Sequence, residues 1–235
     1  MSRDPPLVLG DLLGRNGRRF SPYVWRIRMA LAHKGLSAQV VDITLSDKSA
    51  IEGWSDYRLA PVLKHGEEVV CDSWSIAGYL ERGWPARAAL FPNEAARAFA
   101  LFLNGWVPAA LYPLVLPMIT RDVLDHVHPG DRAIYRRTRE ARLGCSLEEA
   151  QATREARLPV FRAELSPVRG VVETNDFLCG SAPSYADYVL FGLFQWARCT
   201  SRFRLLEKDD PLHAWRTRLL GLYDDLAAAA PGYPC

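Results

Sequence analysis

Cysteine is scarce in this 235-residue chain, and the few that occur form no metal-binding or redox motif. They are odd in number, widely spaced and never part of a Cys-x-x-Cys pair; the five positions are Cys71, Cys145, Cys179, Cys199 and Cys235. This pattern is unlike a disulfide framework or a zinc site. It is typical of reduced cysteines in the cytoplasm, so we expect a cytoplasmic protein without a structural metal ion.

The chain also lacks an excess of one charge and a long apolar run. It has 29 Lys and Arg residues against 27 Asp and Glu residues, a net charge of +2, and only four of the cations are lysines. Because phosphate-driven binding needs a strongly basic surface, we expect no nucleic-acid partner. The N-terminus lacks the apolar segment of a signal peptide, and no run of about 18 apolar residues occurs, so we expect neither secretion nor membrane association.

Hydrophobic residues make up 49% of the chain and charged residues 24%, which is an ordinary globular composition. A chain of this length can bury a sizeable core in one large domain or two small ones. Residues 85–92 carry a proline at each end and break the helical periodicity. We therefore expect a linker there, between a first domain at residues 1–84 and a second at residues 93–235.

The first domain alternates strand-like and helix-like segments. Apolar and β-branched runs predict two strands and a hairpin, at residues 5–13, 38–44 and 60–71. Helices are expected after the first strand and after the hairpin, at residues 21–35 and 72–82, and a short irregular helix is expected after the second strand, within residues 45–58. A mixed sheet built in the order β-α-β-α-β-β-α is the thioredoxin-like architecture.

The first helix has clear start and stop signals. Ser21 suits the N-cap, Pro22 the first helical position and Gly35 the position past the C-terminus. Its apolar residues form one stripe, so three cations on the helix are expected to face solvent, namely Arg26, Arg28 and Lys34. The Ser21 hydroxyl lies beside free backbone N–H groups and the positive end of the helix dipole, where a bound thiolate is favoured. A simple N-cap role for Ser21 is the alternative.

Two further features lie around the hairpin. Ala60-Pro61 precedes its first strand, and a cis bond there would turn the backbone N–H and C=O of Ala60 outward, toward a peptide ligand. Asp72 and Ser73 open the next helix, where they offer a carboxylate, a hydroxyl and N-terminal N–H groups to the ammonium and carboxylate of an amino acid. A turn proline and an ordinary N-cap are the alternatives for each feature taken separately.

The second domain is expected to be all-helical, because strand-like alternation is lacking after residue 93 and strong helix formers are abundant. Three prolines fall in one segment, which they must kink or break: Pro108, Pro113 and Pro117. Residues 184–187 read Ser-Tyr-Ala-Asp and predict a capping box at the start of a helix. The arginines of residues 132–142 are expected on a solvated helix face, and His126 and His128 are too few for a metal site.

The Ser21-Pro22 helix start, the Ala60-Pro61 strand start and the Asp72-Ser73 helix start, in this order of elements, resemble the glutathione-binding domain of glutathione S-transferases. The capping box at residues 184–187 is similar to the one in the helical domain of that family. The resemblance implies the glutathione transferase fold, in which a thioredoxin-like N-terminal domain precedes a C-terminal helical domain.

Within the family, residues 21–35 and 72–80 resemble most closely the bacterial β-etherases and the related fungal etherase-like transferases. The chain departs from this branch at two places. Ala60 stands where many members carry Val, which changes little because backbone atoms make the expected contact. The chain ends at Cys235 without the long C-terminal extension of some etherases, which is expected to leave the substrate pocket more open.

The resemblance implies a role for each residue of the first-domain motifs. Ser21 would donate a hydrogen bond to the sulfur of glutathione, the co-substrate, and would stabilise the attacking thiolate. Ala60, followed by Pro61, would hold the cysteinyl backbone. Asp72 and Ser73 would hold the γ-glutamyl end.

The second domain is expected to supply the pocket for a small hydrophobic aromatic substrate. Trp106 and Tyr112 lie where the first long helix of the family faces glutathione, although core packing explains them equally well. The expected reaction is β-aryl ether cleavage or conjugation of an aromatic electrophile, and the family also implies a homodimer. A non-catalytic glutathione-fold scaffold is the alternative from another class. A redox enzyme that forms mixed disulfides would need a cysteine in place of Ser21.

Overall fold

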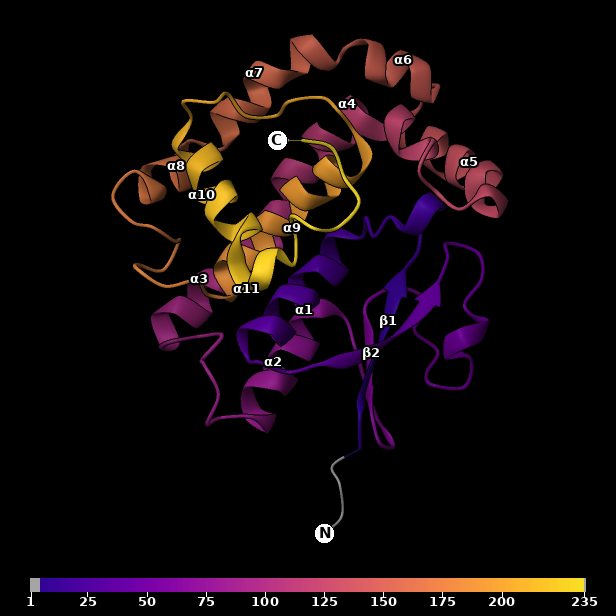
Figure 1. The fold of residues 1–235 in the computed structure, drawn as a ribbon. Coiled ribbons are helices and arrows are strands. Elements are labelled where there is room, and N and C mark those ends of the chain that lie inside the picture. Colours follow the sequence, from indigo (N-terminus) through magenta and orange to yellow (C-terminus); the bar gives the residue numbers. More distant parts are fainter. Residues whose placement is uncertain (1–4, 235) are drawn as a thin grey trace.

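The N-terminal part of the chain forms a mixed four-stranded sheet (Figure 1). The computed structural model describes residues 5–234. The strands lie in the order β2-β1-β3-β4, with bounds Ala38–Ile43, Leu7–Leu12, Val62–His65 and Glu68–Cys71. β1 runs parallel to β2 and antiparallel to β3, and β3 forms a hairpin with β4. The thioredoxin-like sheet predicted from the sequence is confirmed.

Helix α1 (Pro22–His33) connects the two parallel strands and packs against both α2 (Ser73–Gly83) and the helical domain (Figure 1). Ser21 is its N-cap, and the Ser21 Oγ accepts a hydrogen bond from the Val24 backbone N–H at 3.3 Å. Gly35 follows the helix with a φ of 61°, a left-handed conformation that glycine adopts without a steric penalty. The predicted start and stop signals are therefore confirmed.

Two of the cations expected to face solvent on α1 are buried instead. Arg26 has no exposed surface, and its guanidinium donates to Asn104 Oδ1 at 2.7 Å. Lys34 is 2% exposed and forms an ion pair with Glu81 at 2.7 Å. The prediction was wrong because the apolar stripe identifies only the side of α1 that faces the sheet. The helical domain and the linker cover the other side with polar partners.

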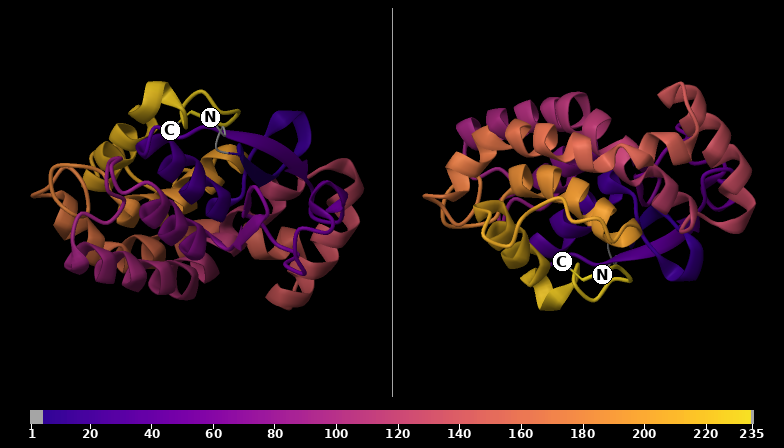
Figure 2. Two further views of the ribbon diagram at one scale, coloured as in Figure 1. Left: turned by 90° about the horizontal axis from the view of Figure 1, so that it is seen from below. Right: turned by 90° about the horizontal axis from the view of Figure 1, so that it is seen from above.

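Residues 45–58, where a short irregular helix was expected, contain little helix. The segment contains only η2 (Ser49–Ile51), a single 3₁₀ turn. The backbone N–H groups of Leu45 and Ser46 donate to the carboxylate of Asp131 at 2.7 and 3.0 Å. Because the second domain takes these N–H groups, the segment after β2 is held as an irregular loop. Views from above and below show the start of α5 beside this loop (Figure 2).

The hairpin turns at Gly66, which has a φ of 60°, and the Ala60-Pro61 bond before it is cis. Val62 of β3 pairs with Cys71 of β4, so Pro61 and Asp72 come next at the same end of the hairpin. Asp72 is the N-cap of α2. The hairpin therefore brings the two motifs that flank it to one end of the sheet.

The helical domain follows residues 85–92, which form neither helix nor strand. Its α-helices are α3 (Glu94–Trp106), α4 (Tyr112–Leu124), α5 (Arg132–Leu143), α6 (Leu147–Ala152), α7 (Arg154–Glu164), α8 (Ser166–Val172), α9 (Tyr185–Thr200), α10 (Pro211–Leu220) and α11 (Leu222–Asp225). Helix α9 is its centre, because almost every residue of α9 is buried. The predicted all-helical second domain is confirmed.

The three prolines expected to kink or break one segment are accommodated without a break. A π-helical turn, η3 (Val107–Leu111), joins α3 to α4. Pro108 lies near the start of this turn, Pro113 near the start of α4 and Pro117 inside α4. Proline removes a backbone donor and displaces the carbonyl four residues before it, and a π turn absorbs such a mismatch.

Within residues 5–234, the continuous helix Glu94–Leu124 is long and apolar enough to cross a membrane by length and composition alone. Core helices of globular proteins meet the same test. Here α3 and α4 pack against α9, and α4 also packs against α6 and α7.

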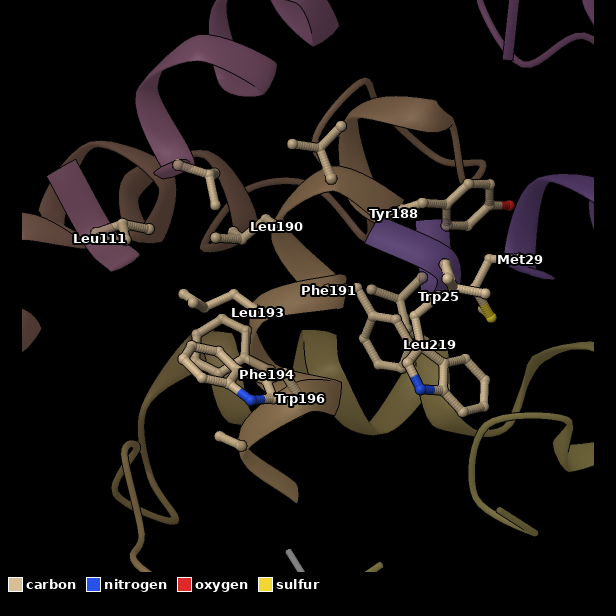
Figure 3. Close-up of a cluster of buried hydrophobic side chains, with 14 of the residues drawn as sticks. Trp25, Met29, Leu111, Tyr188, Leu190, Phe191, Leu193, Phe194, Trp196 and Leu219 are labelled. Carbon is tan, nitrogen blue, oxygen red and sulfur yellow. The ribbon is translucent and has the colours of Figure 1, made fainter. Parts of the chain in front are cut away.

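The two domains share one hydrophobic core where α1 lies on α9 (Figure 3). Trp25 and Met29 of α1 are fully buried there, beside Tyr188 and Phe191 of α9. The helices approach so closely that a Cβ atom at Gly192 would lie 2.3 Å from the Pro22 carbonyl oxygen. The capping box predicted at Ser184 and Asp187 is present and starts α9.

Candidate active site

A cavity of about 280 Å³ opens between the two domains at the N-terminal end of α1. The first domain lines it with residues that include Ser21, Tyr23, Lys48, Arg58 and Ala60. The second domain contributes residues that include Tyr112, Tyr135, Arg139, Arg142 and Trp196. Among the described residues, no Asp or Glu side chain lines this cavity. Its walls are therefore aromatic and its polar groups are hydroxyls and cations.

A second hollow, of about 590 Å³, lies within the helical domain. Acidic and basic side chains both line it, including Asp122, Glu155, Arg154 and Arg204. None of the site residues predicted from the sequence lies there. The cavity at Ser21 is therefore the candidate active site.

The Ser21 hydroxyl lies at the N-terminal, positive end of the α1 dipole, and Ser21 is 6% exposed. Its oxygen accepts the N–H of Val24, and a hydroxyl that accepts one hydrogen bond keeps its own proton for another acceptor. The N-cap role and the capacity to donate to a ligand therefore coexist in one side chain. An anionic sulfur in the cavity would meet both this donor and the positive end of the helix.

Ala60 lines the same cavity, two residues before the first paired residue of β3. Its backbone groups precede the sheet ladder, because the β1–β3 pairing begins at Val62. An extended peptide ligand would find an unpaired main-chain donor and acceptor at this place.

Asp72 and Ser73 follow β4 at the same end of the hairpin as Pro61, and none of these three residues lines the cavity itself. Asp72 has φ 63° and ψ 153°, a backbone conformation that residues other than glycine rarely adopt and that is typical of ligand-binding positions. Its Oδ1 accepts the backbone N–H groups of Trp74 and Ser75 at 2.8 and 3.0 Å, which leaves Oδ2 for a ligand. Ser73 is 4% exposed.

The helical domain fixes this helix start from behind. The Tyr185 hydroxyl donates to the Ser73 carbonyl at 2.7 Å, across the domain boundary. Burial raises the pKa of Tyr185 to about 12, so the phenol keeps its proton for this bond. The first residue of α9 thereby holds the N-terminus of α2 in place.

Of the two residues expected to form the aromatic pocket, only Tyr112 lines the cavity. Its hydroxyl accepts a hydrogen bond from the buried Arg26 at 3.3 Å, and burial raises its pKa well above the usual value. Trp106 lies outside the cavity: its indole N–H donates to Glu164 at 3.3 Å and its ring stacks on Phe102. Trp106 and Tyr112 are six residues apart, a spacing that 3.6 residues per turn places on different faces of a helix, so the two residues do not share a wall.

Both domain models of one protein family match this chain. A model described as glutathione S-transferase, N-terminal domain, matches residues 17–87, and one described as glutathione S-transferase, C-terminal domain, matches residues 98–212. The chain belongs to the glutathione S-transferase superfamily. The matches cover the sheet domain apart from β1 and most of the helical domain, in the order that the fold requires.

Curated relatives of this transferase-family chain are distant. Glutathione transferase omega-1 of Caenorhabditis elegans is 27% identical over 193 residues, which cover 82% of this chain and 66% of the nematode protein. The matched segments span 38% to 43% of three plant glutathione S-transferase relatives.

Solved glutathione S-transferases share the fold of this family member. Glutathione transferase GSTFuA3 from Phanerochaete chrysosporium has a TM-score of 0.82 and 22% identity, covering 92% of this chain and 97% of that one. CsGST63524 of Ceriporiopsis subvermispora, determined in complex with glutathione, has a TM-score of 0.76 and 20% identity, covering 93% and 96%. These structural similarities, at low sequence identity, establish the fold alone. The etherase-like branch stays a prediction.

The structure of this glutathione S-transferase adds residues that the sequence reading missed. Tyr23 and Trp196 form aromatic walls, and four cations surround the cavity: Lys48, Arg58, Arg139 and Arg142. The segment carrying Arg139 and Arg142 was expected on a solvated face. A helical signal was present, because Tyr135, Arg139 and Arg142 are spaced four and three apart and so share one face of α5. The sequence did not reveal that this face meets the first domain.

Proposed function

We propose that the chain is a glutathione transferase in which Ser21 stabilises the thiolate of bound glutathione. The observation that carries this proposal is that Ser21 and Ala60, from separate elements, line one acid-free cavity at the N-terminus of α1. A hydrogen bond from the Ser21 hydroxyl and the positive helix end both favour the charged form of the thiol, so its pKa falls toward neutrality. The thiolate is then the nucleophile at physiological pH.

The two ends of glutathione fit the two ends of this site. The γ-glutamyl ammonium pairs with Asp72, while the N–H groups at the start of α2 receive the γ-glutamyl carboxylate. The cysteinyl backbone pairs with Ala60. Lys48 and Arg58 are the first-domain cations beside Ala60 and Ser21, and they receive the glycine carboxylate. This arrangement leaves the sulfur beside Ser21.

The second substrate of the proposed reaction is a hydrophobic aromatic molecule. Its ring lies among Tyr23, Tyr112 and Trp196, which line the cavity beside Ser21. In β-aryl ether cleavage, the sulfur–carbon bond forms as the carbon–oxygen bond breaks, and the electron pair leaves with the phenolate. A phenol has a pKa near 10, so its departure needs little help from a general acid. Conjugation of an aromatic halide uses the same thiolate and releases halide.

Calorimetric titration with glutathione, paired with turnover of a model β-aryl ether and a chlorinated nitrobenzene, tests the proposal. We expect Ser21→Ala to bind glutathione with little change but to lose about 100-fold in kcat/KM, the effect of removing one donor from a developing anion. The rate of the variant should also need a higher pH, because the thiol pKa rises. Ser181→Ala, which changes an exposed serine outside the cavity, serves as the matched control.

The outcomes separate the enzyme from the scaffold alternative. Glutathione binding without turnover in either the wild type or Ser21→Ala would favour a non-catalytic glutathione-fold protein. No glutathione binding at all would remove both readings.

A further inference from the structure

Two arginines of α5 line the cavity from the second domain, whereas the residues that we propose to bind glutathione belong to the first domain. Arg139 is partly buried, and its guanidinium carbon lies 4.9 Å from the centre of the Tyr135 ring. It donates a hydrogen bond to the neutral hydroxyl of Thr138, at 3.1 Å. Arg142 lies one turn further along the same face. Both side chains line the cavity from the second domain, and Arg142 is exposed to solvent.

Within residues 5–234, neither of these arginines forms an ion pair. Two other arginines of the same helix do. Arg136 is bound by both Glu140 and Glu148 at 2.8 Å, and Arg132 lies 3.5 Å from Asp125. Acidic side chains thus neutralise Arg132 and Arg136, whereas Arg139 and Arg142 in the cavity, like the exposed Arg137 outside it, have no acidic partner among the described residues.

Glutathione does not account for this charge. Of its anionic groups, only the thiolate and the glycine carboxylate lie in the cavity under the proposed function, and Ser21, Lys48 and Arg58 serve them from the first domain. Arg139 and Arg142 then remain as two like charges that raise the local positive potential. An anionic group on the second substrate would lower this positive potential.

We infer that the second substrate is an aromatic molecule that bears a carboxylate, which Arg139 and Arg142 bind. The inference rests on the proposed function and specifies its substrate. Guanidinium groups match a carboxylate with paired N–H donors, more closely than a lysine ammonium does. Tyr135 on the same face of α5, with Tyr112 and Trp196 behind it, offers apolar surface to the ring that carries the acid. One ligand would thus bridge the aromatic wall and the arginines.

A matched pair of ligands tests the inference without turnover. The probes are 2-naphthoate and 2-naphthylmethanol, which share one ring system and differ in charge, titrated by calorimetry into the full chain with and without saturating glutathione. We expect the wild type to bind the acid at least tenfold more tightly than the alcohol. This preference should shrink as salt is raised, because screening weakens exposed charge interactions.

The double variant Arg139→Gln/Arg142→Gln should lose at least tenfold in affinity for 2-naphthoate and keep its affinity for the alcohol. Tyr135 is buried and its hydroxyl is bonded to Thr120, so the aromatic wall stays in place when the guanidinium groups are removed. Arg137→Gln is the control, since Arg137 is an exposed arginine on the same helix that does not line the cavity. It should behave as the wild type.

Equal affinity of the wild type for acid and alcohol would overturn the inference, as would an unchanged acid affinity in the double variant. A tenfold loss of glutathione affinity in the double variant would also overturn it, because these arginines would then serve glutathione. If the wild type fails to bind glutathione, the proposed function fails. The naphthoate comparison without glutathione still decides whether the arginines bind an aromatic acid.

Discussion

Asp72 adopts a rare backbone conformation and also caps helix α2. Its backbone adopts φ 63° and ψ 153°, a conformation that costs about 1–3 kcal/mol in a residue other than glycine. Two hydrogen bonds to Oδ1 from the next turn offset part of this cost and cap α2. The same conformation leaves Oδ2 available at the end of the hairpin.

We predict that Asp72→Asn weakens glutathione binding about tenfold while the melting temperature stays close to that of the wild type. The amide oxygen keeps both capping bonds, but the charge that pairs with the ligand ammonium is lost. Calorimetry and thermal unfolding measure the two effects separately. Unchanged glutathione affinity would remove Asp72 from the binding site, whereas a large fall in melting temperature would make its role structural.

His33 makes the stability of the fold depend on pH. Its Nδ1 lies 2.6 Å from the Tyr188 hydroxyl, and burial together with the neighbouring Lys34 lowers its pKa below 6.5. The folded chain thus prefers neutral His33, whereas the unfolded chain binds a proton as the pH falls below about 6.5. The stabilisation is complete above that pH and is lost toward the lower, folded-state pKa.

We therefore expect the free energy of unfolding to fall between pH 7.5 and 5.5, with His33 contributing at most about 1.4 kcal/mol per pH unit. His33→Gln keeps a polar partner for Tyr188 and removes the titration, so its decline with acid should be shallower. Urea unfolding at several pH values measures both slopes. Equal slopes in the two proteins would show that other groups set the acid sensitivity.

At the scale of elements, the contact between α1 and α9 sets the position of Ser21. The close approach at Gly192 brings the backbone of Pro22, the residue after Ser21, directly onto α9. A methyl group there would meet backbone atoms that have no side-chain freedom to move.

We predict that Gly192→Ala lowers the free energy of unfolding by about 1–3 kcal/mol, the usual cost of overpacking, and weakens glutathione binding because the start of α1 is displaced. Gly170→Ala on α8 is the matched control, since no atom lies within 4 Å of a Cβ at that site. That variant should be neutral or slightly stabilised. Chemical unfolding and glutathione titration decide, and a neutral Gly192→Ala would disprove the close contact.

Sequence signals predicted the ends of helices well wherever the capping residues lie close in sequence to the helix that they cap. The caps Ser21, Gly35 and Asp72 and the capping box at Ser184 act through neighbours within four residues, so their effect is visible in the sequence. The irregular course of residues 45–58 could not be predicted in detail, because the N–H groups of Leu45 and Ser46 bond to Asp131, far along the chain. Such long-range bonds leave no periodic signal.

The residues of the candidate site show the same contrast between local signals and long-range contacts. Ser21 and Ala60, which line the cavity, could be singled out in the sequence because their motifs are short and local. The burial of Arg26, the displacement of Trp106 and the cavity-facing Arg139 each depend on which face of a helix meets the other domain. A single sequence gives the faces of a helix but not their neighbours.

At the scale of the whole molecule, we predict a homodimer from the family resemblance. The outer face of α3 carries Leu101 and Phe102, which are 53% and 60% exposed. Phe102 stacks between Phe99 and Trp106, so this face is a continuous aromatic surface of the kind enriched at interfaces. We expect light scattering to give about twice 26.4 kDa at micromolar concentration and Phe102→Glu to shift the mass toward one chain. A wild-type mass of one chain would contradict the prediction.

The two domains should unfold as one unit, although a linker separates them in sequence. Trp25 and Met29 of α1 are fully buried, and α9 of the other domain packs against α1 (Figure 3). Separating the domains would expose these side chains to water and leave the Arg26 guanidinium without Asn104. Partial unfolding therefore costs free energy on both sides of the interface.

We expect a single calorimetric transition whose midpoint coincides with those measured by tryptophan fluorescence and far-ultraviolet circular dichroism. A fragment of residues 1–84 should lack a cooperative transition, because nothing replaces α9 on the exposed face of α1. Two resolved transitions, or a fragment that unfolds cooperatively by itself, would mean that the sheet domain is stable without the α1–α9 core. In that case the position of Ser21 would not depend on the helical domain, and the effect predicted for Gly192→Ala on glutathione binding should vanish as well.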